Sequence, residues 1–208
     1  MYKNIVFDMG NVLIMFYPEK TLRKYLTDQN EIDAVMNVFY KSVGYRECDR
    51  GTMTYDELID SMRDQLPPHL IALLRKLYVE QCFGGTEMPP FPEMYDLVLK
   101  LKENGYKTYL LSNAGFDFHD YSKAIPAIGL LDGVVISCEY KLLKPEPEIY
   151  ETLFEKFSLD PAECVFIDDM QENIDGAAAC GMDGICFSPS FEDVSVLKEK
   201  LRERGVKI

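Results

Sequence analysis

One aspartate, Asp8, stands where a short apolar run over residues 5–7 ends and a turn through Met9 and Gly10 begins. A strand that ends on a carboxylate places an anionic oxygen at the carboxyl edge of a sheet, where α/β folds bind ligands. That oxygen could attack phosphorus to give an aspartyl phosphate, while the amides of Met9 and Gly10 hold the phosphoryl oxygens. For a single aspartate, capping of a turn is the commoner role, so both interpretations stay open.

Two further segments could complete such a site. Ser112 and Asn113 follow an apolar run in the same way, although a polar end to a strand is also common. Lys144 precedes a proline, and its ammonium group could neutralise both Asp8 and a substrate phosphate. A lysine before a proline is often structural, and the nearby Lys141 could be mistaken for it.

The adjacent pair Asp168-Asp169 is the most specific element of the sequence. It follows the apolar residues 165–167, and two carboxylates at a strand end are costly unless they are hydrogen-bonded or metal-bound. Oxygen ligands of this kind suit Mg²⁺, which keeps several waters and bridges to phosphate. A purely structural role is the alternative, and it loses weight once Asp8 is counted. The order and spacing of the four segments favour a phosphoryl-transfer enzyme.

Charge and composition limit the function classes. The chain of 208 residues has a formal net charge of −13, which argues against a nucleic-acid partner because a phosphate backbone requires clustered Lys and Arg. Any phosphate site must therefore be made positive locally, by a metal or a buried lysine. With His69 and His119 as the only histidines, a histidine-rich metal site is excluded and a Ser/His/Asp triad is disfavoured.

Cysteine usage and hydropathy indicate the compartment. The six cysteines are scattered without a C-x-x-C pair, so we expect reduced thiols rather than disulfides or a zinc site. No stretch approaches the ~18 unbroken apolar residues of a membrane span. The amino terminus leads directly into a predicted strand, which leaves no room for a signal peptide. We therefore expect a cytoplasmic protein with no membrane partner.

The elements that must position these residues alternate between strands and helices. Short, continuously apolar runs predict parallel strands over residues 5–7, 108–111, 134–136, 165–167 and 184–187. Amphipathic segments predict helices over residues 92–104, 146–157, 171–180 and 192–204. This alternation predicts an α/β fold with a doubly wound parallel sheet.

Residues 17–89 break the alternation, because they contain several amphipathic helices and no convincing strand. Thr54 and Glu57 form a capping-box pattern that opens a helix through Leu66, and leucines at helical spacing predict another over residues 68–83. We expect a small helical bundle over the carboxyl edge of the sheet. The predicted domains are a core of residues 1–16 and 90–208 and an inserted α-helical domain of residues 17–89.

The inserted domain should determine substrate specificity by opening and closing around residues 16–17 and 84–90. We expect more of its candidate residues to pack within the domain than to touch substrate, because aromatic side chains usually fill cores. The candidates to face the site are Phe16, Tyr17, Tyr40, Tyr45, Arg46, Asp49 and Arg50.

Together these motifs resemble the haloacid dehalogenase-like hydrolase superfamily over essentially the whole chain. Asp8, Ser112, Lys144 and the pair Asp168-Asp169 fall on its motif positions. Residues 7–13 and 49–53 look closest to a subgroup that contains a bacterial glucose-1-phosphate phosphatase, with the N-terminal phosphatase domain of soluble epoxide hydrolase as a more distant relative. The resemblance implies a Rossmann-like core with an inserted α-helical C1 cap.

The resemblance also implies a role for each motif residue in a Mg²⁺-dependent hydrolysis of a phosphoric monoester. The implied catalytic residues are Asp8, Ser112 and Lys144, and the implied substrate-binding residues are Met9, Gly10, Ser112, Asn113 and Lys144. The implied metal residues are Asp8, Asp169, the carbonyl of Gly10, and Asp168, which with Asn173 would support the metal shell and the lysine. The substrate would be a small phosphorylated metabolite, with a sugar phosphate as one candidate, and the protein a monomer or homodimer.

The chain departs from the superfamily pattern at Gly10. Most phosphatases of the superfamily carry a second aspartate there, which protonates the leaving alcohol, and positioned acid–base catalysis contributes about 10²–10⁴-fold. Either another group substitutes, or turnover is slow, or the substrate has a good leaving group, as a sugar 1-phosphate does.

Two other functions stay open. A metal-independent haloacid dehalogenase also lacks the acid, but the pair Asp168-Asp169 would then be an unexplained negative cluster. A low-turnover phosphate-binding relative is the second alternative, and the presence of Asp8, Ser112 and Lys144 argues against such decay.

Overall fold

Five parallel strands form one sheet in the computed structural model, which describes residues 1–80 and 88–208. The strands are β1 (Asn4–Phe7), β2 (Lys107–Ser112), β3 (Gly133–Ile136), β4 (Cys164–Asp168) and β5 (Asp183–Cys186). Their order is β3-β2-β1-β4-β5, so the first strand is central and the chain builds the sheet outward on both sides. Every neighbouring pair is parallel, which confirms the predicted α/β fold.

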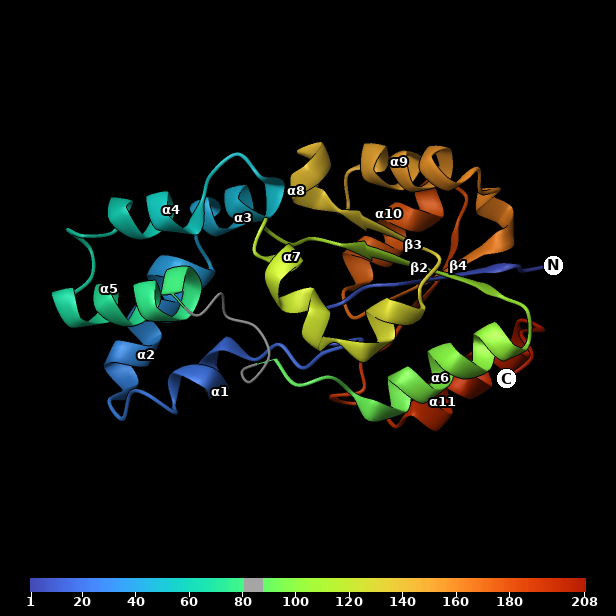
Figure 1. Ribbon diagram of the computed structural model, residues 1–208, viewed down its shortest axis with the longest axis horizontal. Coiled ribbons are helices and arrows are strands. Elements are labelled where there is room, and N and C mark those ends of the chain that lie inside the picture. Colours follow the sequence, from blue (N-terminus) through green and yellow to red (C-terminus); the bar gives the residue numbers. More distant parts are fainter. Residues whose placement is uncertain (81–87) are drawn as a thin grey trace.

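Helices cover both faces of this sheet (Figure 1). One face carries α6 (Pro92–Glu103) and α11 (Val194–Glu203), and the other carries α9 (Pro147–Phe157) and α10 (Gln171–Ala179). Successive side chains of β1 alternate between two apolar clusters: Ile5 belongs to the cluster of Leu97 and Leu201, and Val6 to that of Leu153. Burial on both faces explains the continuously apolar strands and confirms the doubly wound arrangement.

Helical segments fill the interval between β1 and α6. They are α1 (Pro18–Leu22), α2 (Gln29–Val35), the π-helical turn η1 (Met36–Tyr40), α3 (Val43–Arg50), α4 (Tyr55–Ser61), α5 (Pro68–Arg75) and the π-helical turn η2 (Lys76–Glu80). In Figure 1 these helices lie at the end of the molecule opposite both termini, facing the carboxyl ends of the strands. The predicted domain boundaries at residues 17 and 89 stay a prediction, and the predicted hinge glycines Gly84 and Gly85 lie outside the described residues.

The helix α4 has the predicted start but an earlier end. Thr54 accepts a hydrogen bond from the amide of Glu57 and donates its own amide to that side chain, so the capping box is present. The helix stops at Ser61 instead of Leu66, and the chain continues in turns that keep Leu66 buried. Pro67 sets the latest end that a helix could have here, because the residue before a proline disfavours the helical conformation, but it does not explain the end at Ser61.

Several one-turn helices were not predicted, because segments of three to five residues are too short for a hydrophobic period to show. They are α7 (Phe118–Tyr121), η3 (Ser122–Ala124), η4 (Pro126–Leu130), α8 (Ser137–Tyr140) and η5 (Pro161–Glu163). Of these, α7 and α8 follow β2 and β3, so they lie at the same edge of the sheet as the motif residues.

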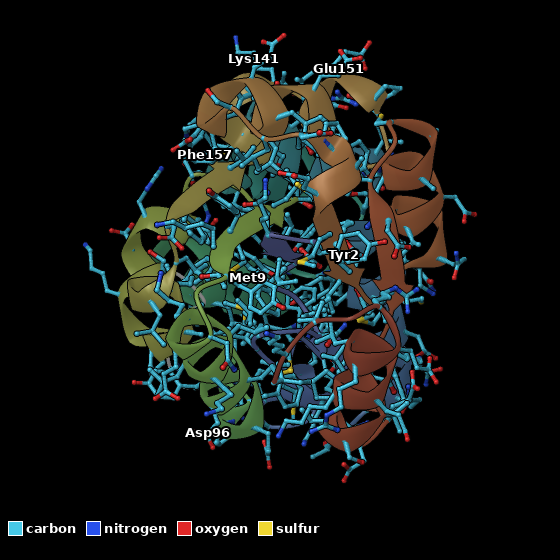
Figure 2. The ribbon with its side chains drawn as sticks, turned by 90° about the vertical axis from the view of Figure 1, so that its right-hand side faces the viewer. Tyr2, Met9, Asp96, Lys141, Glu151 and Phe157 are labelled. Atoms are coloured by element: carbon cyan, nitrogen blue, oxygen red, sulfur yellow. The ribbon has the colours of Figure 1, made fainter. Side chains whose placement is uncertain are left out.

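Charged and apolar side chains separate between surface and interior. Figure 2 shows Met9 inside the molecule, where it is 4% exposed, whereas Asp96, Lys141 and Glu151 extend outward. The five cysteines in the described part of the chain are free thiols, three of them buried. Among the described residues, no helix combines the length and the apolar character that crossing a membrane requires.

Candidate active site

The central strand and its two neighbours end together. Phe7 pairs with Leu110 of β2 and with Ile167 of β4, and the amide of Asp8 donates to the carbonyl of Ile167 at 2.8 Å. The side chains that follow these strands therefore gather at one edge. Sequence motifs separated by more than 150 residues converge there because parallel strands in register must end at a common level.

Lys144 lies between two carboxylates at this edge. Its Nζ is 2.8 Å from Oδ1 of Asp8 and 2.6 Å from Oδ2 of Asp168. Burial raises the pKa of Asp8, and the positive charge of Lys144 opposes that shift. Burial also acts to lower the pKa of Lys144, but Asp168 and Asp8 outweigh it and raise that pKa above its ordinary value. The lysine is therefore held as an ammonium ion beside Asp8.

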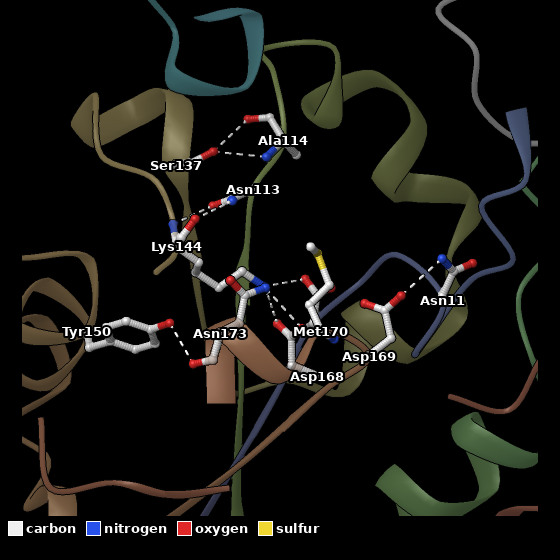
Figure 3. Close-up of polar contacts among 11 residues, drawn as sticks. Asn11, Asn113, Ala114, Ser137, Lys144, Tyr150, Asp168, Asp169, Met170 and Asn173 are labelled. Carbon is white, nitrogen blue, oxygen red and sulfur yellow. Dashed lines mark hydrogen bonds and ion pairs between the residues drawn. The ribbon is translucent and has the colours of Figure 1, made fainter. Parts of the chain in front are cut away.

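Two further residues fix the position of this lysine. The Asn113 side chain accepts a hydrogen bond from the amide of Lys144 at 2.8 Å and donates to its carbonyl at 3.1 Å. Asp168 is fully buried, and its oxygens also accept bonds from the amide of Met170 and the side chain of Asn173. Figure 3 shows this network around the lysine. Neutral donors and one cation thus satisfy a buried carboxylate that would otherwise be costly.

The second aspartate of the pair faces the opposite way, toward Asn11 (Figure 3). The Asn11 amide donates to Oδ2 of Asp169 at 3.2 Å, and its Oδ1 accepts from the amide of Phe16. Asn11 has φ +54°, a left-handed conformation that asparagine adopts more readily than most residues. Burial and the charge of Asp168 raise the pKa of Asp169, and the bond from Asn11 opposes this shift.

The three carboxylates form a cluster that fits a hard divalent cation. One oxygen from each of Asp8, Asp168 and Asp169 lies within 4.8 Å of the others. Among the described residues, Lys144 is the one cation that pairs with Asp8 and Asp168, so three carboxylates against one ammonium give a formal charge of −2 at this edge. Carboxylate oxygens in this number suit Mg²⁺, and a charge of −2 among buried groups favours binding of a divalent ion.

A pocket of about 360 Å³ opens above this cluster. The sheet-edge wall of the pocket, as we name it, includes Asp8, Met9, Gly10, Ser112, Asn113, Lys144 and Asp169. The helical wall includes Tyr45, Arg46, Asp49, Tyr55 and Tyr78. Every motif residue predicted for the site lines this pocket except Asp168, which is fully buried and contacts Lys144.

The candidates in the inserted segment divide nearly evenly. Four of the seven line the pocket, namely Phe16, Tyr45, Arg46 and Asp49. The other three have different environments: Tyr17 stacks edge-on against Phe191, Tyr40 packs in an aromatic cluster with Phe39 and Tyr78, and Arg50 pairs with Glu146. Which of these four residues touch substrate stays a prediction.

Sequence reasoning missed several pocket residues. Asn11 had a signal, since an asparagine beside a glycine is common in turns and tolerates the left-handed conformation. Asp117, Tyr121 and Tyr55 gave no signal, because they reach the pocket only through the packing of α7 and α4 around it.

The helix α3 is attached to the core beside the lysine loop. Arg50 makes a bidentate ion pair with Glu146, with N–O distances of 2.9 and 2.7 Å. The Ser137 hydroxyl donates to the carbonyl of Asp49 at 2.5 Å. Gly51 ends α3 at φ +77° and lies so close to α8 that a Cβ there would be 2.4 Å from a backbone oxygen. These contacts hold the end of α3 against the mouth of the site.

Comparisons with known proteins agree with this architecture. A family model described as haloacid dehalogenase-like hydrolase matches residues 2–181. The sesquiterpene phosphatase astK of Aspergillus oryzae is 27% identical over 201 residues, which cover 95% of this chain and 96% of that protein. The D-ribitol-5-phosphate phosphatase of Bacteroides thetaiotaomicron is 24% identical over 182 residues, covering 84% and 86%.

A solved structure shares the fold over nearly its whole length. It is a HAD family enzyme from Bacteroides thetaiotaomicron in complex with magnesium and inorganic phosphate, with a TM-score of 0.69 and 24% identity over 95% of this chain and 99% of that one. The family model covers all four motif segments, from Asp8 to Asp169. The chain therefore belongs to the haloacid dehalogenase-like hydrolases.

Proposed function

We propose that this hydrolase is a Mg²⁺-dependent phosphatase that cleaves a small phosphoric monoester through an aspartyl phosphate on Asp8. The observation that carries the proposal is the position of Lys144, whose ammonium group lies 2.8 Å from Asp8 at a carboxylate cluster below the pocket. A phosphate dianion requires positive charge beside the nucleophile, and the acidic chain supplies it locally through this buried lysine.

The residues of the chain would divide the work as follows. The free oxygen of Asp8 attacks phosphorus, and Lys144 and the hydroxyl of Ser112 hold the phosphoryl oxygens. Asp168 and Asn113 keep the lysine in place, and water then cleaves the aspartyl phosphate. Asp8, Asp169 and the carbonyl of Gly10 would hold Mg²⁺, with Asp168 in support. When bound, the ion neutralises the excess negative charge and polarises the phosphoryl group.

The relatives support the same reaction class. A protein similar over nearly the whole chain is a sesquiterpene phosphatase, and another is a ribitol-5-phosphate phosphatase. A structure of the same fold holds magnesium and inorganic phosphate. A pocket of about 360 Å³ suits a small metabolite, such as a sugar phosphate, rather than a macromolecule.

The haloacid dehalogenase alternative fits the charges less well. Three carboxylates around one lysine would repel a haloacid, which is itself an anion, unless a metal ion were also bound. Burial and the charge of Asp168 raise the pKa of Asp169, so its carboxylate is unfavourable at this position. A metal-independent reaction would give that carboxylate no function to offset this cost.

Phosphate release from a panel of sugar, nucleotide and lipid phosphates tests the proposal. We expect release with Mg²⁺, a loss of at least about 10²-fold after EDTA treatment, and recovery when Mg²⁺ but not Na⁺ is added back. Halide release from 2-haloacids that survives EDTA, together with no phosphate release from any ester, would replace the proposal with the dehalogenase alternative.

A further inference from the structure

The position that lacks the expected acid has room for one. A Cβ added at Gly10 would have one neighbour within 4 Å, the Cβ of Phe16 at 3.9 Å, which is an ordinary van der Waals contact. Gly10 lines the pocket and does not have positive φ, so its backbone conformation does not require glycine. Packing therefore does not explain the missing acid, and the proton must reach the leaving group from elsewhere in the pocket.

Asp49, at the end of α3, presents a carboxyl group to the same pocket. It is half-buried, belongs to the helical wall and lines the same pocket as Asp8, whose charge acts on it. The Tyr55 hydroxyl donates to its Oδ1 at 3.3 Å. The bond from Ser137 to its carbonyl and the close approach of Gly51 to α8 hold the backbone at Asp49 and just after it. Contacts with the core thus hold the backbone of a residue whose carboxyl group lines the pocket.

The surroundings of Asp49 favour its neutral form. Burial and the charge of Asp117 raise its pKa to about 7, the bond from Tyr55 and the charge of Arg46 oppose this, and the charge of Asp8 adds to the rise. The titratable and charged groups that face it are Asp8, Arg46, Cys48, Tyr45, Tyr55, Asp117, Tyr121 and Cys138. A carboxyl group that titrates near neutrality can both donate and accept a proton there.

On the basis of the proposed phosphatase function, we infer that Asp49 is the general acid and base that replaces the missing side chain at Gly10. In the first step, the bond from Asp8 to phosphorus forms while the ester P–O bond breaks. The proton of Asp49 passes to the leaving oxygen, and the products are an alcohol, the aspartyl phosphate and the Asp49 carboxylate.

The second step returns the proton. Asp49 takes a proton from water as the water oxygen attacks phosphorus, and the bond to Asp8 breaks. Inorganic phosphate leaves, and both aspartates regain their starting forms. This assignment makes the helical wall part of the chemistry and ties turnover to the docking of α3 on the core.

A series of phosphate esters with different leaving groups tests the inference on the full-length protein with Mg²⁺. Asp49→Asn should lower kcat/KM about 10²–10⁴-fold on alkyl phosphates, and less than about 10-fold on p-nitrophenyl phosphate, which needs no protonation. On alkyl phosphates the wild type should lose activity as pH rises through about 7, and the variant should lose that limb. Gly10→Asp in the Asp49→Asn background should restore alkyl ester hydrolysis.

Asp117→Asn is the matched control, because it removes a second pocket carboxyl group whose pKa burial raises to about 6. Because the charge of Asp117 helps to raise the pKa of Asp49, we expect this variant to shift the loss of alkyl phosphate hydrolysis to lower pH but to keep that limb. On the acidic side of the limb its effect should be similar for all leaving groups. The inference is overturned if Asp49→Asn leaves the dependence on the leaving group unchanged, or if Asp117→Asn abolishes the high-pH limb and steepens that dependence as much as Asp49→Asn does. A wild-type protein that hydrolyses none of the esters would instead contradict the proposed phosphatase function itself.

Discussion

The two walls of the pocket handle charge in opposite ways. On the sheet-edge wall, the lysine Lys144 pairs with Asp8 and Asp168 and stays charged although it is buried. On the helical wall, Asp49 accepts one 3.3 Å hydrogen bond from Tyr55, and no ion pair joins it to a cation among the described residues. Burial raises the pKa of both Asp8 and Asp49 to about 7. Among the described residues, a contacting ammonium ion opposes the rise at Asp8, whereas at Asp49 the charge of Arg46, which forms no ion pair with it, and the bond from Tyr55 oppose it.

This difference separates two tasks. A nucleophile must be ionised when the substrate arrives, and a neighbouring ammonium ion stabilises that form. A proton donor must be neutral and able to regain its proton, and a carboxyl group without a contacting cation among aromatic side chains satisfies this condition. At the sheet edge, hydrogen bonds with Asn113, Asn173 and the amide of Met170 hold Lys144 and Asp168, whereas the helical wall depends on the docking of α3.

The largest predicted effect is a loss of activity when the nucleophile on the sheet-edge wall is removed, compared with a small change from a substitution on the helical wall. Asp8→Asn removes the nucleophile, so we expect kcat to fall by more than about 10³-fold. Tyr55→Phe on the helical wall removes one hydroxyl and should change kcat and KM by less than about 10-fold. Steady-state kinetics and circular dichroism on both variants measure this contrast. If Asp8→Asn kept more than a tenth of the wild-type rate with an intact fold, the sheet-edge mechanism would be wrong.

The next prediction compares the stability of a buried and an exposed lysine. Lys144→Met leaves the buried carboxylates of Asp8 and Asp168 without their cation, and breaking such a pair costs about 3–5 kcal/mol. Lys3→Met removes the exposed partner of Glu163, and a surface pair of this kind is worth about 0–1 kcal/mol. Urea denaturation at pH 7 without added metal measures both free energies of unfolding. Equal losses in the two variants would show that Lys144 is not a structural cation.

The smallest effect concerns the dependence of stability on pH. The pKa of Asp49 is raised from 3.8 to about 7 in the folded protein, so the folded state binds this proton more tightly than the unfolded state. Near pH 3 the carboxyl group is protonated in both states, so its titration does not lower the free energy of unfolding. As pH rises from about 4 to about 7, the group would ionise in the unfolded state first, and the wild type therefore loses stability over this range. Relative to the wild type, Asp49→Asn should therefore gain on the order of 1–3 kcal/mol at pH 8 and almost none at pH 3.

Asp132→Asn provides a control of opposite sign. Burial acts to raise the pKa of Asp132, but hydrogen bonds from Lys102, the amide of Thr108 and Lys107 lower it overall. Its carboxylate stabilises the fold above its unfolded pKa, and that contribution is lost as pH falls through the lower folded value. The variant should thus be less stable than the wild type at pH 8. Thermal unfolding of the wild type and both variants from pH 3 to pH 8 measures these differences. If both variants were more stable than the wild type at pH 8, or both less stable, our assignment would be wrong.

Much of the sheet and of its polar edge could be predicted from the sequence. Asp8, Ser112 and Asp168 each follow or end a short apolar run, and parallel strands in register bring such ends together whatever the rest of the chain does. Local patterns sufficed because a strand buried on both faces is recognisable from its own residues. The sequence thereby determined the fold class and the group of residues around the proposed nucleophile.

Only the tertiary structure decided what stands opposite that edge. Asp49 faces the pocket because Arg50 pairs with Glu146, 96 positions away, and because Ser137 bonds the backbone of α3. Asp117 and Tyr121 line the pocket from the start and end of α7, a one-turn helix too short to show a hydrophobic period. No local pattern encodes such contacts, since they depend on how amphipathic helices dock onto a finished sheet, and that docking is set by packing and ion pairs between distant segments.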